Sequence, residues 1–198
     1  MASPTKSYAV VAALQELAAN SVYTGTPIDM GAKLGGLLII QFGRAVTTAL
    51  TAGVQFRVEA SGAASGNMAW HPIGQFQSAI ATAIRLAVTT TSNSGQKELT
   101  LSTTTGYALR DRIFVENVTL LNSEFHRVVL VHAATHLTVE DNLANTQADT
   151  TSFVATAAES YGCPIEMGVA RIRLVVDNSP NGVAIRFKAD LSLVDTFA

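Results

Sequence analysis

The stretch 106–143 constrains the fold of this chain most, because three short runs of β-branched and aromatic residues follow one another there. The runs are 112–116, 125–131 and 137–140, and turn-forming residues separate them. Runs of this length and composition predict β-strands, and three such strands can close on one another into a small module. Polar segments with few apolar residues, 89–95 and 145–152, flank it. We expect them to be the crossings between an insert and a host domain.

The clearest single strand outside this module is 54–60, in which apolar and polar residues alternate strictly. That pattern predicts a strand with one buried and one exposed face. The apolar run 37–42 is expected to be a strand buried on both faces. Segment 69–73 is expected at a sheet edge, because Pro72 has no N–H to donate to a neighbouring strand. The spacing in 7–20 fits either a helix or a strand, and we favour the strand because everything after it is β.

Two alternating stretches near the end of the chain, 168–176 and 183–189, are joined by the Asn/Pro/Gly-containing segment 177–182. We expect them to form a β-hairpin that packs on the strands of the first half. The predicted fold is therefore all-β, with a jelly-roll-like β-sandwich built from residues 1–90 and 151–198 and a small β-barrel inserted at 91–150.

Charge is scarce in this chain. Only 14% of the 198 residues are charged, against about 25% in typical soluble domains, while 48% are apolar. A surface with so few charges is most simply explained by partners that cover it, as in an oligomer or a shell. The net charge of −2 argues against a nucleic-acid partner. No membrane span or signal peptide is recognisable, so we expect a protein made in a cytoplasm that remains soluble.

No pattern in the sequence indicates catalysis, a cofactor or a metal, and we expect none. His132 and His136 have the spacing of two metal ligands on a helix, but they fall in a turn between predicted strands. His132 and His136 are interpreted as ordinary solvent-facing histidines. Cys163, the only cysteine, is expected to be a small, partly buried apolar residue. Trp70, beside His71 and a Gly/Ser loop, has two interpretations: a core or interface anchor, which we favour, or a ring that stacks on a sugar.

Several segments of the sequence resemble segments of small structural proteins of tailed bacteriophages. In the host domain these segments are 5–14, 28–35, 42–44, 54–61 and 68–72. In the insert they are 106–116 and 123–128, and the insert is similar to a small β-barrel module recurring in virion proteins. Arg110 departs from that pattern, which more often has glycine there. The resemblance implies a head decoration, or cement, protein that binds the outside of an assembled capsid, often as a trimer, and helps it resist internal pressure.

These observations lead to two functional hypotheses. In the first, the chain is a non-enzymatic decoration protein on the virion surface, made in a bacterial host, with the major capsid protein and further copies of itself as partners. Pro4, Thr5 and Lys6, in an N-terminal arm that orders on the shell, are the expected capsid contacts. In the second, the chain is a tail or fibre component that binds a host glycan through Trp70, His71 and the loops of the insert.

Overall fold

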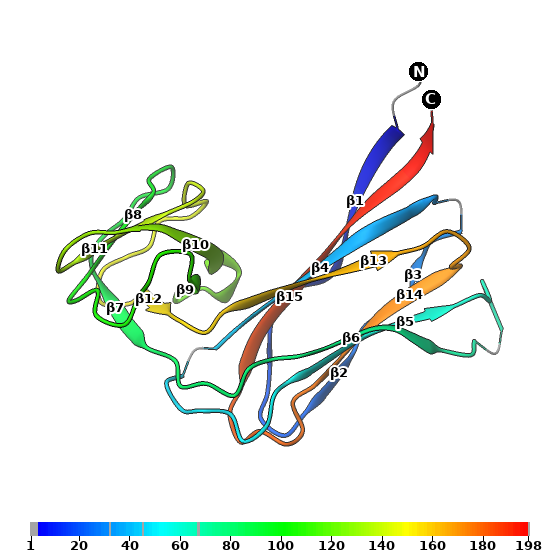
Figure 1. Cartoon of the computed structure of the whole chain (residues 1–198), viewed down its shortest axis with the longest axis horizontal. Helices are drawn as coiled ribbons and strands as arrows, with labels where there is room; N and C mark the ends of the chain where they lie inside the picture. The colour runs from blue at the N-terminus through cyan, green and yellow to red at the C-terminus, as the bar shows by residue number, and fades with distance from the viewer. Residues whose placement is uncertain (1–3, 32, 45, 67, 198) are drawn as a thin grey trace.

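The computed structural model describes residues 4–31, 33–44, 46–66 and 68–197. It confirms the predicted all-β fold: two antiparallel sheets form a sandwich, and six further strands close into a barrel. Figure 1 shows the barrel beside one end of the sandwich, with the two ends of the chain close together near the other end. The one helical element among the described residues is the 3-10 turn η1 (Leu120–Asn122).

The first sheet of the sandwich has four strands in the order β1-β15-β4-β13. They are β1 (Pro4–Leu17), β15 (Ile185–Phe197), β4 (Gly35–Gly43) and β13 (Glu159–Ile165). Since β1 is extended throughout, the preference for a strand over a helix in 7–20 is confirmed as far as Leu17. Phe187 on β15 lies opposite Phe42 on β4, and Ile39 on β4 lies opposite Gly162 on β13.

The second sheet has the order β2-β14-β5-β6, with β3 also pairing with β14. Its strands are β2 (Val22–Thr24), β3 (Ile28–Asp29), β14 (Arg171–Asp177), β5 (Gln55–Ser61) and β6 (His71–Gln77). The predicted edge position of the segment around Pro72 is confirmed, because β6 is the last strand of this sheet. The alternation of β5 is confirmed for Phe56 and Val58, which are fully buried, and for the exposed Arg57, whereas Glu59 on the outward face is buried as well.

The two sheets enclose one continuous apolar core. The rings of Phe42 on the first sheet and Phe56 on the second meet edge to face, with their centroids 5.6 Å apart. Cys163 is buried in this core as a free thiol, as expected, and burial raises its pKa. The core residues recur at every second position of β4, β5, β14 and β15, because successive side chains of a strand point to opposite faces of the sheet.

The predicted hairpin of 168–176 and 183–189 is wrong. Its first strand, β14, belongs to the second sheet, while its second strand, β15, belongs to the first. The connection is a corner between the sheets, held by two asparagines with no exposed surface, Asn178 and Asn181. Asn178 Nδ2 donates to the carbonyl oxygens of Ala18 (3.0 Å) and Val183 (2.9 Å). The same polar turn residues that close a hairpin can therefore hold a crossing between layers.

The barrel is formed by the chain between β6 and β13. Its strands are β7 (Arg85–Thr90), β8 (Glu98–Leu101), β9 (Arg112–Glu116), β10 (Glu124–Val131), β11 (His136–Val139) and β12 (Phe153–Ala155), closed in the order β10-β11-β8-β7-β12-β9. It has an apolar core of its own, which includes Val88, Val128 and Val154.

The chain enters and leaves the barrel at Ile84 and Thr156, outside the polar segments that were expected to be the crossings. The N–H of Thr156 donates to the oxygen of Ile84 at 2.9 Å, and the N–H of Ile84 donates to Thr156 Oγ1 at 2.9 Å. The polar segments belong to the barrel, where Ser92 and Gln147 form a β-bridge. The barrel strands thus extend beyond 91–150 at both ends, and the division into two independently folding domains stays a prediction.

The barrel is joined to the sandwich by close packing and by an ion pair between Glu116 and Arg186. Glu116 on β9 accepts hydrogen bonds from Arg85 of the barrel, with Arg85 Nη2 at 2.6 Å from its Oε2, and its Oε1 lies 3.7 Å from Arg186 Nη2 of β15. At the end of β4, Gly43 lies against the rings of Phe114 and Phe125. The outward face of the first sheet is therefore covered by the barrel at this end.

Candidate functional site

The residues described contain no group of three or more His, Cys, Asp and Glu side chains that could hold a metal ion. As expected, His132 and His136 lie at the turn between β10 and β11, where the N–H of His132 donates to the oxygen of His136 at 2.9 Å. Each ring is engaged by a threonine: Thr138 for His132 and Thr135 for His136. The arrangement offers no pair of convergent nitrogens backed by a carboxylate.

His126, on the barrel strand β10, is buried. Its Nε2 lies 2.9 Å from a carboxylate oxygen of Glu124, two residues earlier on β10. Glu124 also accepts hydrogen bonds from the N–H groups of Ala144 and Asn145, both at 2.8 Å. The carboxylate thus fixes the loop after β11, which is a structural role.

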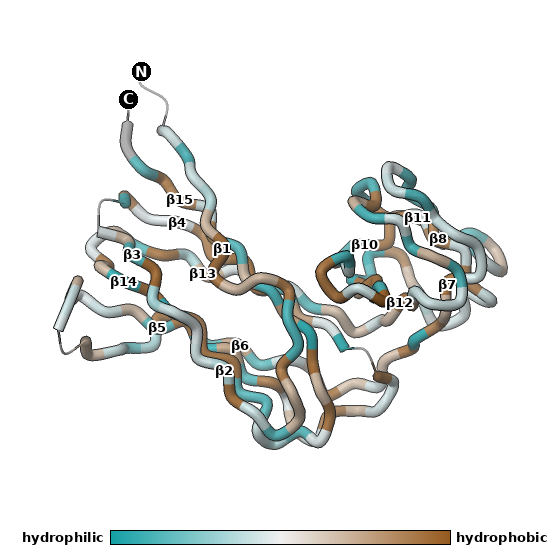
Figure 2. The backbone as a smooth tube through the Cα atoms, turned by 180° about the vertical axis from the view of Figure 1, so that it is seen from behind, coloured by the Kyte–Doolittle hydropathy of each residue, from teal (hydrophilic) through white to brown (hydrophobic). Residues whose placement is uncertain are grey.

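The predicted N-terminal arm does not exist as a separate segment over Pro4, Thr5 and Lys6. These residues begin β1, and Pro4 and Lys6 lie opposite Phe197 and Val194 on β15. Residues 1–3 of the predicted arm lie outside the described part of the chain. Figure 2 shows β1 and β15 running side by side to the two ends of the chain. The expected capsid contacts are therefore part of the sheet.

Trp70 occupies neither of the apolar cores, so the interpretation as a core anchor is wrong. It is half-buried just before β6, and the guanidinium carbon of Arg173 lies 4.3 Å from the centroid of its ring. His71 is exposed beside it. The start of β6 lies at the end of the sandwich far from the barrel (Figure 1). The structure therefore does not bring Trp70 and His71 together with the loops of the insert into one glycan site.

The outward surface of the first sheet exposes apolar residues on β1 and β4, on either side of the polar Ser192 and the charged Asp190 of β15. The register aligns Tyr8, Ser192, Leu37 and Pro164 in one row across β1, β15, β4 and β13, and Val10, Asp190, Ile39 and Gly162 in the row two residues further along β4. Tyr8 is 79% exposed, Val10 65%, Leu37 43% and Ile39 40%. We call this surface, formed by Tyr8, Val10, Leu37, Ile39, Pro164 and Val194, the open face.

The expectation that the run 37–42 is buried on both faces is wrong for the outward face of β4. Leu38, Ile40 and Phe42 point into the core with no exposed surface, while Leu37 and Ile39 point outwards. Apolar residues on both faces of a strand are typical of a strand covered on both sides. In the isolated chain, however, Leu37 and Ile39 are exposed, so the outward side of β4 is uncovered at these two residues.

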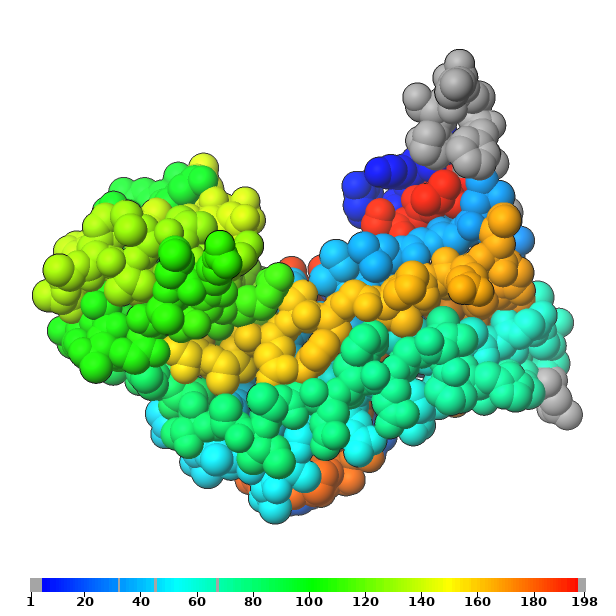
Figure 3. Space-filling view, in the orientation of Figure 1, coloured from blue at the N-terminus to red at the C-terminus, as the bar shows by residue number. Residues whose placement is uncertain are grey.

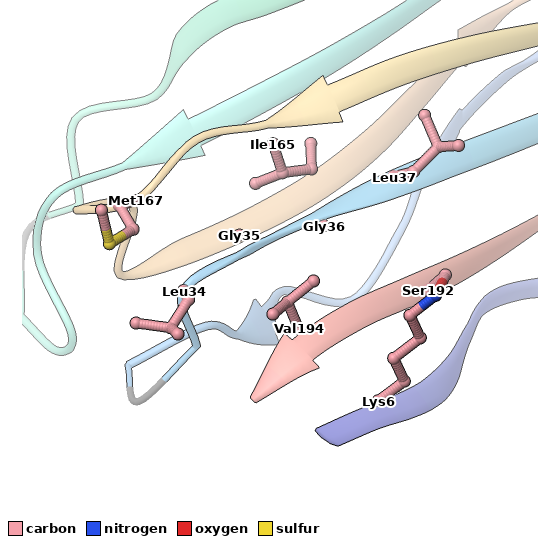
Figure 4. Close-up of a pocket in the computed structure, with 9 residues that line it drawn as sticks. All are labelled: Lys6, Leu34, Gly35, Gly36, Leu37, Ile165, Met167, Ser192 and Val194. Carbon is pink, nitrogen blue, oxygen red and sulfur yellow. The ribbon is translucent and has the colours of Figure 1, made fainter. Parts of the chain in front are cut away.

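At one end the open face deepens into a hollow of about 720 Å³, lined mainly by apolar residues. Figure 4 shows Leu34, Met167 and Val194 around the start of β4, where Gly35 and Gly36 bring no side chain to fill the space. Met167 is 68% exposed there. Methionine is flexible and polarisable, so it adapts to apolar groups of different shapes. The hollow is therefore suited to receive an apolar side chain of a protein partner.

The open face lies in a notch of the molecule. Figure 3 shows this notch between the barrel, drawn in green and yellow, and the blue and red ends of β1 and β15, with β4 along its lower edge. The barrel covers the outward face near Gly43 and Arg186, as described above, and its turn η1 lies close to β1. The remainder of the face is accessible within the described residues.

The opposite surface of the sandwich has a different chemistry. On the outward face of the second sheet, Glu59 lies between Arg57 and Arg173, whose Nε atoms are 2.6 and 2.7 Å from its two carboxylate oxygens. Burial raises the pKa of Glu59, but the hydrogen bonds from Arg173 and Arg57 outweigh it, and the net pKa is lowered. Three charged groups of this surface are therefore paired with one another, whereas the open face exposes apolar side chains.

No family model matches the chain, and no curated protein matches its sequence. Among solved structures it is similar to a chain of infectious bursal disease virus Gx strain, with 10% identity and a TM-score of 0.25 over 98% of this chain and 43% of that one. The Gt strain of the same virus gives 11% identity and a TM-score of 0.24, over 96% of this chain and 41% of that one.

VP17, a capsid protein of bacteriophage P23-77, gives 7% identity and a TM-score of 0.20 over 97% of both chains. The chain spans less than half the length of the two infectious bursal disease virus chains. It therefore has weak structural similarity to viral capsid proteins, which assigns no family. Similarity at this level does not identify the role of any residue in this chain.

Proposed function

We propose that the chain is a non-enzymatic structural protein of a tailed-bacteriophage particle, which binds the outer surface of the capsid and stabilises it. The observation that carries this proposal is the open face, where Leu37 and Ile39 expose apolar surface in the middle of a well-ordered sheet. A contiguous exposed apolar surface typically marks a protein interaction site. The resemblance of the sequence to phage structural proteins supplies the kind of partner, a major capsid protein.

The scarcity of charge supports the same proposal. Only 14% of the residues are charged, and on the second sheet Arg57 and Arg173 both pair with Glu59. A surface of this kind binds through many apolar and weakly polar contacts. The resemblance also implies that the chain associates with itself, often as a trimer. The mass of the purified protein in solution measures how many copies associate.

The experiment is reconstitution of purified particles that lack the protein. Ile39→Lys, opposite Asp190, and Leu37→Asp, opposite Ser192, each place a charge in the open face without touching the core and without facing a like charge, so both variants are expected to fold normally and to bind particles at least about tenfold more weakly. Val118→Asp is the matched control, because Val118 is 80% exposed on the barrel, away from the open face. Wild-type binding by both open-face variants would contradict the proposal.

The alternative, a tail or fibre component that binds a host glycan, depends on Trp70. The partial exposure of its ring keeps this alternative testable, although Arg173 covers one part of it. Trp70→Ala is expected to leave the fold intact, since the ring is outside both apolar cores. Glycan binding by the wild type that this variant loses would favour the tail or fibre role.

A further inference from the structure

Among the edge strands of the sandwich β1 is the longest, although it begins with Pro4 and has three register shifts in its pairing with β15. Natural proteins protect such edges with prolines, bulges or very short strands. On the other edges, β13 contains Pro164, β6 contains Pro72 and β2 has only three residues. β1 has 14 residues, and within the described chain no strand pairs with it on the side away from β15.

One stretch of β1 is regular enough to accept another strand. The pairing with β15 is irregular between Pro4 and Lys6 and again between Val10 and Ala12, but it is unbroken from Lys6 to Val10. Tyr8 and Val10 in this stretch are the most exposed apolar residues of the open face. The stretch therefore combines an unpaired backbone edge with an uncovered apolar surface.

We propose that a second copy of this chain adds its own β1 to this edge, antiparallel, with a two-fold axis at Tyr8. In this register the regular stretch pairs with itself: Tyr8 lies opposite the partner's Tyr8, and Lys6 opposite the partner's Val10. No like charges face each other, and two aromatic rings meet at the axis, an arrangement that favours cross-strand pairing. A two-fold interface of this kind is self-complementary and closed.

This pairing has a consequence for the open face. An antiparallel two-fold axis stands perpendicular to the sheet, so two four-stranded sheets become one continuous sheet with both open faces on the same side. Leu37 and Ile39 of both copies then lie on one surface, which can bind a partner through two sites at once. The inference does not depend on the virion role, and it replaces the trimer implied by the resemblance with a pair.

The test is the mass of the full chain in solution, by sedimentation equilibrium. Wild type is expected at 41.6 kDa, twice the chain mass of 20.8 kDa. Tyr8→Lys and Tyr8→Glu are each expected to be monomeric, because the axis places the two like charges opposite each other. An equimolar mixture of the two variants is expected to return to 41.6 kDa, since opposite charges then face each other.

Val10 provides a second pair of variants, because it lies opposite the partner's Lys6 in the proposed register. Val10→Glu is expected to pair at least about tenfold more tightly than Val10→Lys, although both remove the same apolar side chain. Val118→Lys, on the barrel, should leave the mass unchanged. Circular dichroism of each variant verifies that it is folded.

The proposal is overturned if wild type sediments as a monomer or as a trimer of 62.4 kDa, three times 20.8 kDa. It is also overturned if the mixture of the two Tyr8 variants stays monomeric. A monomer that binds particles and loses that binding on Tyr8→Lys would assign the edge of β1 to a capsid protein. Loss of the pair without loss of particle binding would leave the virion role standing.

Discussion

Gly43 at the end of β4 lies directly beneath Phe114 of the barrel: a Cβ atom at Gly43 would be 2.8 Å from the Cβ of Phe114. This contact, between residues 71 positions apart in the sequence, sets how closely the barrel approaches the sheet. Phe114 is fully buried, and its ring lies 4.9 Å from that of Phe125, centroid to centroid. Glycine is required here for space, so this position links the two parts of the molecule.

Gly43→Val is therefore expected to lower the free energy of unfolding by about 1 to 3 kcal/mol, because the added methyl groups force Phe114 and Phe125 apart. Urea unfolding measures the loss. Gly62→Val is the control, since a Cβ at Gly62 meets no atom within 4 Å. Equal stability of the two variants would show that the barrel is not packed against β4 at Gly43.

Arg110→Gly is expected to stabilise the protein. Arg110 has a φ of 75°, in the left-handed region, and its side chain is exposed. A non-glycine residue in that conformation costs about 1 to 2 kcal/mol, part of which the greater freedom of glycine in the unfolded chain offsets. We expect a net gain of about 0.5 to 1 kcal/mol, measured by thermal unfolding. Arg112→Gly, within β9, should instead destabilise by a similar amount.

Glu124→Gln is expected to destabilise the barrel by about 2 to 3 kcal/mol at pH 7, because the carboxylate accepts hydrogen bonds from two backbone N–H groups and the Gln147 amide beside His126. Burial raises the pKa of Glu124, but the hydrogen bonds from His126, Ala144 and Asn145 outweigh it, and the net pKa is lowered. Glu140→Gln, at an exposed carboxylate, is the control.

The sign of the pH dependence follows from the lowered pKa. The stabilisation by the Glu124 carboxylate is fully present above the pKa of the unfolded chain, about 4.3, and is lost as the pH falls through the lower pKa of the folded state. Urea unfolding of wild type and Glu124→Gln should therefore differ strongly at pH 7 and much less at pH 3. A difference that is the same at both pH values would contradict this role of the carboxylate.

Replacing residues 85–155 with a short Gly/Ser link is expected to leave the sandwich folded. Ile84 and Thr156 are already hydrogen-bonded at 2.9 Å, so the link closes only a short loop. Replacing residues 92–150 is expected to give a less soluble protein, because Val88 and Val154 then remain in the chain while the rest of the barrel core that buries them is removed. Solubility and circular dichroism compare the two products. An insoluble protein from the wider replacement would show that the barrel is integral to the sandwich.

The strands could be predicted from the sequence better than their partners. Alternation identified the strands around Phe56, Leu174 and Phe187, because the pleat repeats every two residues wherever one face is buried. It could not show that β14 and β15 lie in different sheets, because the buried Asn178 and Asn181 have the same local chemistry in a hairpin turn and in a corner. Only the long-range pairing decides between them.

The candidate site was harder to predict for a related reason. Apolar residues at Leu37 and Ile39, next to the core residues of β4, are typical of a strand buried on both faces. The prediction drawn from them holds only if a partner covers the outward face. At Arg110 the comparison with the resembling module was informative. The module more often has glycine there, and the backbone of Arg110 is left-handed, a conformation that favours glycine. Trp70 could not be placed, because a single tryptophan has no pattern that separates a core position from the surface position beside Arg173.

The copy number of this chain in purified particles, relative to the major capsid protein, tests the proposed function most directly. Quantitative mass spectrometry measures it without any variant. A structural protein of the capsid surface predicts a number of copies comparable to that of the capsid protein. A handful of copies per particle would instead assign the chain to the tail or fibres, and its absence from particles would contradict a virion role altogether.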